Sequence, residues 1–155
     1  MRSLIMADNI DDMVKRLQEA VLAGCSQKLK DELFNARNIG RIENPDSHVR
    51  ITGVCGDTIQ MFLSIRDGRI QDVKFTTDGC GFTVACANYV ARTAKGKSVE
   101  EALGIEPGEV DRYFEGLPEE NKHCAKLAVI TLRALLEEYC TKPNPEKLGD
   151  VDVAE

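Results

Sequence analysis

The stretch Phe75-Thr76-Thr77-Asp78-Gly79-Cys80-Gly81-Phe82-Thr83-Val84-Ala85-Cys86 contains the end of a predicted strand and the start of a predicted helix. Cys80 lies at this junction between two glycines. Glycine accepts positive φ and leaves room for close backbone approach. The free N–H groups of a helix N-terminus lower the pKa of a cysteine thiol. The stretch therefore predicts a thiolate that is presented for metal binding or nucleophilic attack.

Two further stretches carry side chains that can complete a site with Cys80. Cys55 and Asp57 lie directly before a predicted strand, and at spacing two in an extended chain their side chains point the same way. His123 precedes Cys124 at the start of a predicted helix and is turned about 100° from it. These three cysteines all lie at element ends, where exposed sites are built.

The chain has six cysteines, and without an export signal we expect reduced thiols rather than disulfides. Cys86 is six positions past Cys80, about 600° of helical rotation, so it faces away from it. We interpret Cys86 as a small buried residue, with an extra redox thiol as the alternative. Cys140 follows Cys124 by more than four helical turns and cannot reach the same ion. Cys25 lies at a predicted helix break and is interpreted as a small structural thiol.

Three thiolates with one carboxylate or imidazole form a four-ligand set, which fits zinc or a small iron–sulfur cluster. The chain has no Cys-x-x-Cys pair, and this disfavours zinc fingers and ferredoxin-like electron carriers. A Cys-His-Asp hydrolase is a weaker alternative, because His123 and Cys124 are sequence neighbours and such neighbours are poorly placed as nucleophile and base. A purely structural zinc module is a further alternative.

The sequence before Cys80 predicts a β-hairpin. Residues Thr58–Arg66 alternate between apolar and polar side chains, Asp67-Gly68 is a strong turn signal, and Arg69–Thr77 form the returning strand. In this alternation Phe62 belongs to the polar face. A shorter strand is expected over residues 48–54, after a loop over residues 35–47 that contains Asn, Gly and Pro breakers.

The remaining segments predict helices, each with a recognisable start signal or apolar stripe. Their expected extents are residues 8–23, a helix capped by Ser26, 81–95, 98–103, 107–114 and 121–139. The segment from Thr141 to Glu155 is polar, contains two prolines and is predicted to be disordered.

The chain has 155 residues, a net charge of −6 and a pI of about 5.1. This size predicts one globular domain, and the acidic balance disfavours nucleic acid and anionic membrane surfaces as partners. No apolar run approaches the roughly 20 residues of a membrane span. The first residues fit neither a signal nor a transit peptide, since three aspartates follow directly, and Met6 is an alternative start to Met1. We expect a cytoplasmic protein.

Taken together, these motifs resemble the iron–sulfur cluster scaffold family of the IscU and NifU N-terminal type. The matching residues are Asn38-Ile39-Gly40, Cys55-Gly56-Asp57, Lys74-Phe75, Gly79-Cys80-Gly81, Lys95-Gly96-Lys97-Ser98 with Glu101-Ala102-Leu103, and His123-Cys124 with Leu127-Ala128. The resemblance implies an α+β fold with a three-stranded antiparallel sheet and helices packed on one face. We expect an N-terminal helical extension over residues 1–25, a scaffold domain over 26–140 and a tail over 141–155.

The resemblance also implies a function: a scaffold rather than an enzyme. Such a protein receives sulfur as persulfide from a cysteine desulfurase, combines it with iron and electrons into a labile [2Fe–2S] cluster, and passes the cluster to apoproteins. A ferredoxin and an iron-delivery or regulatory protein are further expected partners. By family position Cys55, Cys80 and Cys124 are cluster ligands, Asp57 and His123 compete for the fourth place, and Cys124 is the main persulfide acceptor. Asp57, a hard carboxylate, is predicted to make the cluster labile.

Two departures from the family pattern bear on its partners and chemistry. The chaperone-docking motif Leu-Pro-Pro-Val-Lys is replaced by Leu117-Pro118-Glu119-Glu120-Asn121, which predicts little or no Hsp70 docking. Phe82 and Cys86 stand where relatives carry small or hydroxyl residues. The alternative function is that of a zinc-dependent sulfur acceptor of the SufU type, an enzyme whose relatives have an insertion before the last cysteine and lack the histidine. The 44-residue interval from Cys80 to Cys124 and the presence of His123 favour the scaffold.

Overall fold

The computed structural model describes residues 26–54 and 56–141. The predicted helix over residues 8–23, Cys25, Cys55 and the predicted tail from residue 142 onward lie outside the described residues. Thr141, which we placed in the tail, is the last residue of the final helix.

The sheet has three antiparallel strands in the order β1-β2-β3, namely β1 (Ser47–Thr52), β2 (Thr58–Arg66) and β3 (Arg69–Thr77). The bounds of β2 and β3 are those predicted from the alternation, whereas β1 begins one residue earlier and ends two residues earlier than expected. Asp67 and Gly68 both have positive φ, 55° and 76°, as a tight hairpin turn requires. The predicted hairpin is therefore confirmed.

Helices and one short 3-10 turn account for most of the remaining described chain: α2 (Gln27–Phe34), α3 (Gly81–Ala94), α4 (Val99–Leu103), α5 (Pro107–Tyr113), η1 (Glu119–Asn121) and α6 (Lys122–Thr141). Their starts follow local chemistry. The Ser26 hydroxyl accepts from the backbone of Leu29, Ser98 and Glu101 form a reciprocal capping box, and Pro107 occupies the first turn of α5. None of these helices is long and apolar enough to cross a lipid bilayer.

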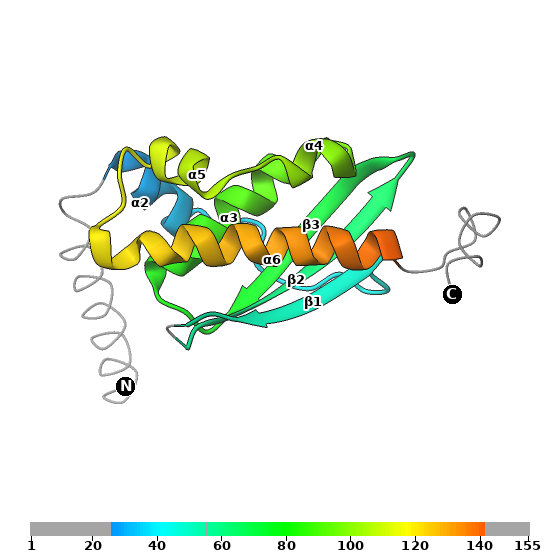
Figure 1. The fold of residues 1–155 in the computed structure, drawn as a ribbon, viewed down its shortest axis with the longest axis horizontal. Coiled ribbons are helices and arrows are strands. Elements are labelled where there is room, and N and C mark those ends of the chain that lie inside the picture. Colours follow the sequence, from blue (N-terminus) through cyan, green and yellow to red (C-terminus); the bar gives the residue numbers. More distant parts are fainter. Residues whose placement is uncertain (1–25, 55, 142–155) are drawn as a thin grey trace, which may run out of the picture.

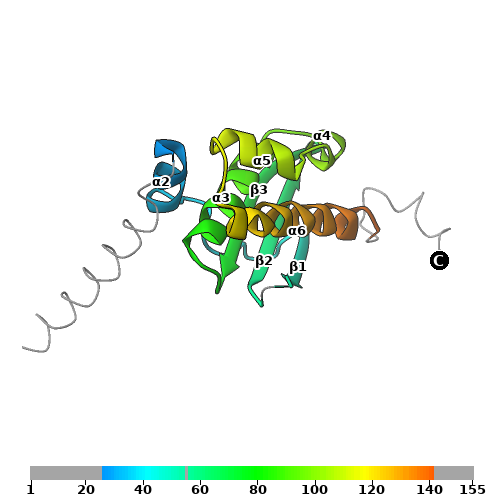
Figure 2. The same ribbon diagram turned by 60° about the vertical axis from the view of Figure 1, so that its left-hand side comes forward.

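Helices α3 and α6 cover one face of the sheet, with α4 and α5 packed beyond them (Figure 1), and Figure 2 shows the same layers from the side. The inward residues of the hairpin have no exposed surface; they are Ile59, Met61, Leu63, Val73 and Phe75. They pack with the buried faces of α3 and α6 into one core. The predicted α+β architecture, with helices on a single face of the sheet, is confirmed.

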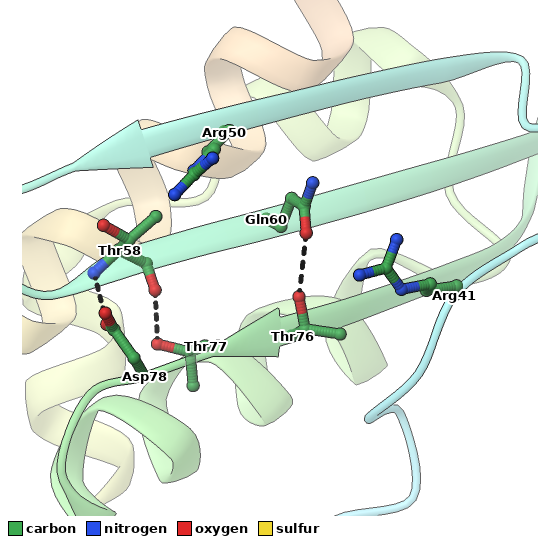
Figure 3. A pocket seen from close by; sticks show the side chains of 7 residues that line it. All are labelled: Arg41, Arg50, Thr58, Gln60, Thr76, Thr77 and Asp78. Carbon is green, nitrogen blue, oxygen red and sulfur yellow. Dashed lines mark hydrogen bonds between the residues drawn. The ribbon is translucent and has the colours of Figure 1, made fainter.

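The opposite face of the sheet carries a polar groove of about 380 Å³ (Figure 3). It is lined by Arg41, Arg50, Thr58, Gln60, Thr76, Thr77 and Asp78. Phe62 also belongs to this face, as the alternation predicted, yet it is only 5% exposed. Its ring stacks on His48 at 4.8 Å between centroids, and the Arg41 guanidinium lies 5.8 Å from the ring centroid. Polar side chains therefore bury an aromatic residue on a face that none of the described helices covers.

A buried polar network fixes α2 and the following loop against α3. Asn88 accepts from both the backbone and the side-chain amide of Asn38, at 3.0 and 3.1 Å, and donates to Glu32. Glu32 also pairs in bidentate fashion with Arg92, at 2.8 and 3.1 Å. The loop then joins the edge of β3 because Gly40 donates to the carbonyl of Phe75. The Asn38-Ile39-Gly40 motif is thus a docking segment for the sheet edge.

This network predicts that Asn88→Ala strongly destabilises the fold. The substitution leaves both Asn38 donors without their acceptor in a buried setting and removes one hydrogen bond to Glu32, whose carboxylate keeps its pair with Arg92. We expect the free energy of unfolding to fall by about 3 kcal/mol. Gln71→Ala, on the exposed part of β3, is the control and should change it by less than about 0.5 kcal/mol. Urea unfolding followed by circular dichroism measures both, and similar midpoints for the two variants would contradict the role of the network.

Candidate thiol and metal site

Three segments that carry predicted site residues meet at one end of the molecule. They are the loop between β1 and β2, the start of α3 and the start of α6 (Figure 1). The first loop turns at Gly56, whose φ is 94°, and is closed by a hydrogen bond of 2.8 Å from the Gly53 amide to the carbonyl of Asp57. Asp57 is thereby directed toward α3. Cys55, the first predicted ligand, lies in this loop but outside the described residues.

Cys80 is the N-cap residue of α3 and is exposed to solvent. We expected the flanking glycines to permit positive φ or close approach, and only the second reason applies, since neither has positive φ. A Cβ atom on Gly79 would lie 2.8 Å from Asp57 Oδ2 and from Thr83 Cβ. A Cβ atom on Gly81 would lie 3.1 Å from Leu33 Cδ2 of α2. The glycines therefore let the loop, α2 and α3 approach the thiol closely.

The hydroxyl of Thr83 lies among three of the predicted site residues. Its Oγ1 is 2.9 Å from Asp57 Oδ2, 3.4 Å from Cys124 Sγ and 3.7 Å from Cys80 Sγ. Thr83 is fully buried. We did not predict this residue from the sequence, although a signal was present: residues three apart on a helix share a face, so Thr83 faces the same side as Cys80.

Cys124 and His123 complete the described part of the site. Cys124 is fully buried in the first turn of α6, and its Sγ is 3.7 Å from His123 Nε2. His123 is half-buried and lines an apolar hollow of about 240 Å³ beside the loop after β1. The structure thus brings Asp57, Cys80, His123 and Cys124 together, as predicted from their positions at element ends.

The sulfurs of Cys80 and Cys124 lie 3.7 and 3.4 Å from the same Thr83 hydroxyl, and interaction between the two thiols makes their acidities diverge. Interaction with the Cys124 thiol is the main reason that the pKa of Cys80 falls to about 5, assisted by the backbone amides of Thr83 and Phe82 and opposed by partial burial. The same interaction, together with burial, raises the pKa of Cys124. The pair therefore holds one thiolate, on the exposed Cys80, and one thiol, on the buried Cys124.

The other described cysteines lie away from this pair. Cys86 is fully buried in α3, and burial raises the pKa of its thiol, which agrees with a small core residue. Cys140 is exposed near the far end of α6, about 24 Å along the helix from Cys124 at 1.5 Å per residue. Within residues 26–54 and 56–141, no three His, Cys, Asp or Glu side chains are close enough to hold one ion. Thr83 lies between the candidate ligands, and Cys55 lies outside the described residues.

Comparison with known proteins gives a family match over most of the chain. Residues 25–146 match the family described as NifU-like N terminal domain. A scaffold protein for iron–sulfur cluster assembly, IscU, of Archaeoglobus fulgidus is 38% identical over 118 residues, which cover 76% of this chain and 77% of that protein. The Escherichia coli scaffold protein IscU is 34% identical over 122 residues, which cover 76% of this chain and 94% of that protein.

Solved structures show the same fold at lower sequence identity. An N-terminal NifU-like protein from Brucella abortus superposes with a TM-score of 0.64 at 18% identity, covering 76% of this chain and 95% of that one. A putative cluster assembly scaffold for the SUF system from Fervidobacterium islandicum has a TM-score of 0.61 at 23% identity, covering 72% and 95%. At such identities the likeness concerns the fold alone.

The thiol pair predicts a distinctive pH profile of alkylation. With a pKa of about 5, Cys80 is ionised at neutral pH, so its labelling by iodoacetamide should be nearly independent of pH above about pH 6 and fall below about pH 5. Cys124 and Cys86 should stay unlabelled in the folded chain because both are buried. Peptide mapping by mass spectrometry gives the rate at each cysteine.

The matched variants for this experiment are Cys124→Ala and Cys140→Ala. Removing the Cys124 thiol should shift the Cys80 profile to higher pH, since interaction with it is the main cause of the low pKa. Removing Cys140, at the far end of α6, should leave the profile unchanged. If the rate of Cys80 alkylation in the unmodified chain rose throughout the range from pH 6 to pH 8, this would contradict the low pKa.

Proposed function

The chain belongs to the NifU-like N-terminal domain family, and from this membership we propose that it is a scaffold on which an iron–sulfur cluster is assembled and from which it passes to apoproteins. The observation that supports the proposal most directly is the convergence of the Cys80 sulfur, the Cys124 sulfur and the Asp57 carboxylate around the Thr83 hydroxyl, at 3.7, 3.4 and 2.9 Å. Soft sulfur donors bind iron–sulfur clusters well, and a site near the surface allows a bound cluster to be transferred to another protein.

The proposed cargo is a [2Fe–2S] cluster bound by Cys55, Cys80 and Cys124. The fourth ligand is either Asp57 or His123. Both candidates contact the described thiol site: Asp57 through Thr83, and His123 directly at the sulfur of Cys124. The same donors suit a zinc ion, which is the proposed occupant when iron and sulfur are not supplied.

Sulfur is proposed to arrive from a cysteine desulfurase as a persulfide on Cys124. Because Cys124 is fully buried, transfer to its sulfur requires that the residues covering it move aside. Sulfane sulfur must gain two electrons to become sulfide, so the proposal includes an electron donor of ferredoxin type. An iron-delivery or regulatory protein and the recipient apoproteins complete the proposed partners, and the proposed location is the cytoplasm. Little or no Hsp70 docking is proposed, since Glu119 and Glu120 replace the Pro-Val of the docking motif.

A second candidate is a zinc-dependent sulfurtransferase of the SufU type. One of the solved structures of similar fold is titled as a scaffold for the SUF system. Against this candidate stands His123, 3.7 Å from Cys124, because relatives of that type lack the histidine. Desulfurase turnover in the presence of the zinc-loaded chain separates the two functions. A large stimulation that needs zinc and yields no cluster would favour the sulfurtransferase.

The ligand set predicts which serine variants lose cluster assembly. Cys55→Ser, Cys80→Ser and Cys124→Ser should each abolish or severely impair it, because each removes a soft ligand. Cys25→Ser and Cys140→Ser should assemble the cluster as the unmodified chain does. The measurement is anaerobic reconstitution with iron, cysteine and a desulfurase, followed by absorption and Mössbauer spectra. Loss of the cluster in Cys140→Ser together with its retention in Cys80→Ser would refute the proposed ligands.

The carboxylate of Asp57 is expected to make the cluster easier to release. A carboxylate oxygen exchanges with water or an incoming thiolate more readily than a cysteine sulfur does, and its charge disfavours the gathering of thiolates around one site. Asp57→Ala should therefore still assemble the cluster, but should transfer it more slowly to an apo-ferredoxin and keep it longer in air. Circular dichroism follows the transfer. Equal or faster transfer, with a shorter-lived cluster, would remove Asp57 from the release step.

A further inference from the structure

The space between the proposed ligands is occupied by a side chain that is not itself a ligand. Thr83 Oγ1 contacts the carboxylate of Asp57 at 2.9 Å and the sulfurs of Cys124 and Cys80 at 3.4 and 3.7 Å. An ion bound to these groups would lie about 2.0–2.3 Å from each donor atom. An oxygen in contact with all three donors leaves no room for such an ion among them.

The hydroxyl of Thr83 has one hydrogen, and the carboxylate is its strongest acceptor. Oxygen acceptors form shorter and stronger hydrogen bonds than sulfur acceptors, and the contact with Asp57, at 2.9 Å, is the shortest of the three. Gly79 fixes this arrangement, because Asp57 Oδ2 and Thr83 Cβ both lie 2.8 Å from the position of a Cβ on that glycine. The Asp57 carboxylate is therefore held by Thr83 rather than directed at the two thiols.

Threonine in a helix can release such a contact by a single rotation. It populates two χ1 rotamers, because its hydroxyl can also bond to the carbonyl three or four residues earlier in the helix. For Thr83 these carbonyls belong to Cys80 and Gly79, at the N-terminus of α3. Rotation onto one of them would break the hydrogen bond to Asp57 and free the carboxylate.

We propose that Thr83 is a positioning residue that gates metal entry: its hydroxyl fills the ligand gap and holds Asp57 until it rotates away. The inference rests on the proposed function, because Asp57, Cys80 and Cys124 are the proposed ligands. It assigns Thr83 control over when the carboxylate becomes available to iron. Thr83 thereby acts through Asp57 and makes no bond to the metal.

The experiment compares Thr83→Ala, Thr83→Ser and Thr83→Val in the full chain, with Co²⁺ alone as the probe. Alanine removes both the hydroxyl and the obstruction. Serine keeps the hydroxyl and its freedom to rotate. Valine keeps the branched shape of threonine but cannot hydrogen-bond to Asp57, so it separates the loss of the hydrogen bond from the loss of bulk. Titration followed by the thiolate-to-cobalt charge-transfer band gives the affinity, and thermal unfolding without metal reports the structural effect of each substitution.

We expect Thr83→Ala to bind Co²⁺ about tenfold more tightly than the unmodified chain, since a hydrogen bond to a charged group no longer competes for Asp57. Thr83→Ser should bind within about twofold of the unmodified chain. Thr83→Val should bind about tenfold more weakly than Thr83→Ala, because its two methyl groups keep bulk beside the ligands. In an Asp57→Ala background the gain from Thr83→Ala should vanish, because the two residues are then uncoupled.

A purely structural role gives a different pattern, in which alanine and valine both weaken binding in parallel with lost thermal stability. That pattern overturns the gate, as does a gain from Thr83→Ala that persists without Asp57. An unmodified chain that shows no charge-transfer band with Co²⁺ overturns the proposed thiolate ligands, and the gate with them. Tight binding by the unmodified chain that is unaltered in Thr83→Ala overturns the gate alone.

Discussion

The junction between β3 and α3 has no space for a side chain at Gly79, and the arrangement of the site depends on this constraint. The Asp57 carboxylate and Thr83 both pack against that glycine, at distances that a Cβ atom would violate. The constraint places the loop after β1 against the first turn of α3. With α6 packed beside α3, the buried thiol of Cys124 then reaches the same point. A close backbone approach thus brings together side chains from three segments that are distant in sequence.

The acidity of the site follows from the same geometry. Two neighbouring thiols differ in acidity when one lies at an exposed helix N-terminus and the other is buried. The amide groups of the first turn of α3 stabilise negative charge on Cys80, while burial opposes charge on Cys124. The exposed sulfur is consequently the nucleophilic one in the metal-free chain. Binding a metal at both sulfurs requires the loss of the Cys124 proton, which links metal affinity to pH.

The buried polar network around Asn88 holds α2 and the Asn38 loop in place against α3. Leu33 of α2 lies against Gly81, directly beside the Cys80 thiol. The bidentate pair between Glu32 and Arg92 and the two hydrogen bonds from Asn38 fix α2 relative to α3. Apolar contacts alone would permit small shifts of this helix, whereas buried hydrogen bonds specify its position. The network therefore supports the site without contacting it.

The sequence by itself predicted the described elements and singled out most of the proposed site residues. Period-two alternation and the Asp67-Gly68 turn predicted the hairpin, and capping residues predicted the helix starts. Positions at the ends of elements singled out Cys80 and Cys124, together with Asp57 and His123. These features are local, and a side-chain pattern along one segment is enough to encode them. Only the tertiary structure decided that Thr83 lies among the proposed ligands, that Cys124 is buried while Cys80 is exposed, and that Phe62 is covered on the open face of the sheet. Each of these depends on which segments approach one another and how closely, and such distances are set by packing across the whole fold rather than by the residues of any one segment.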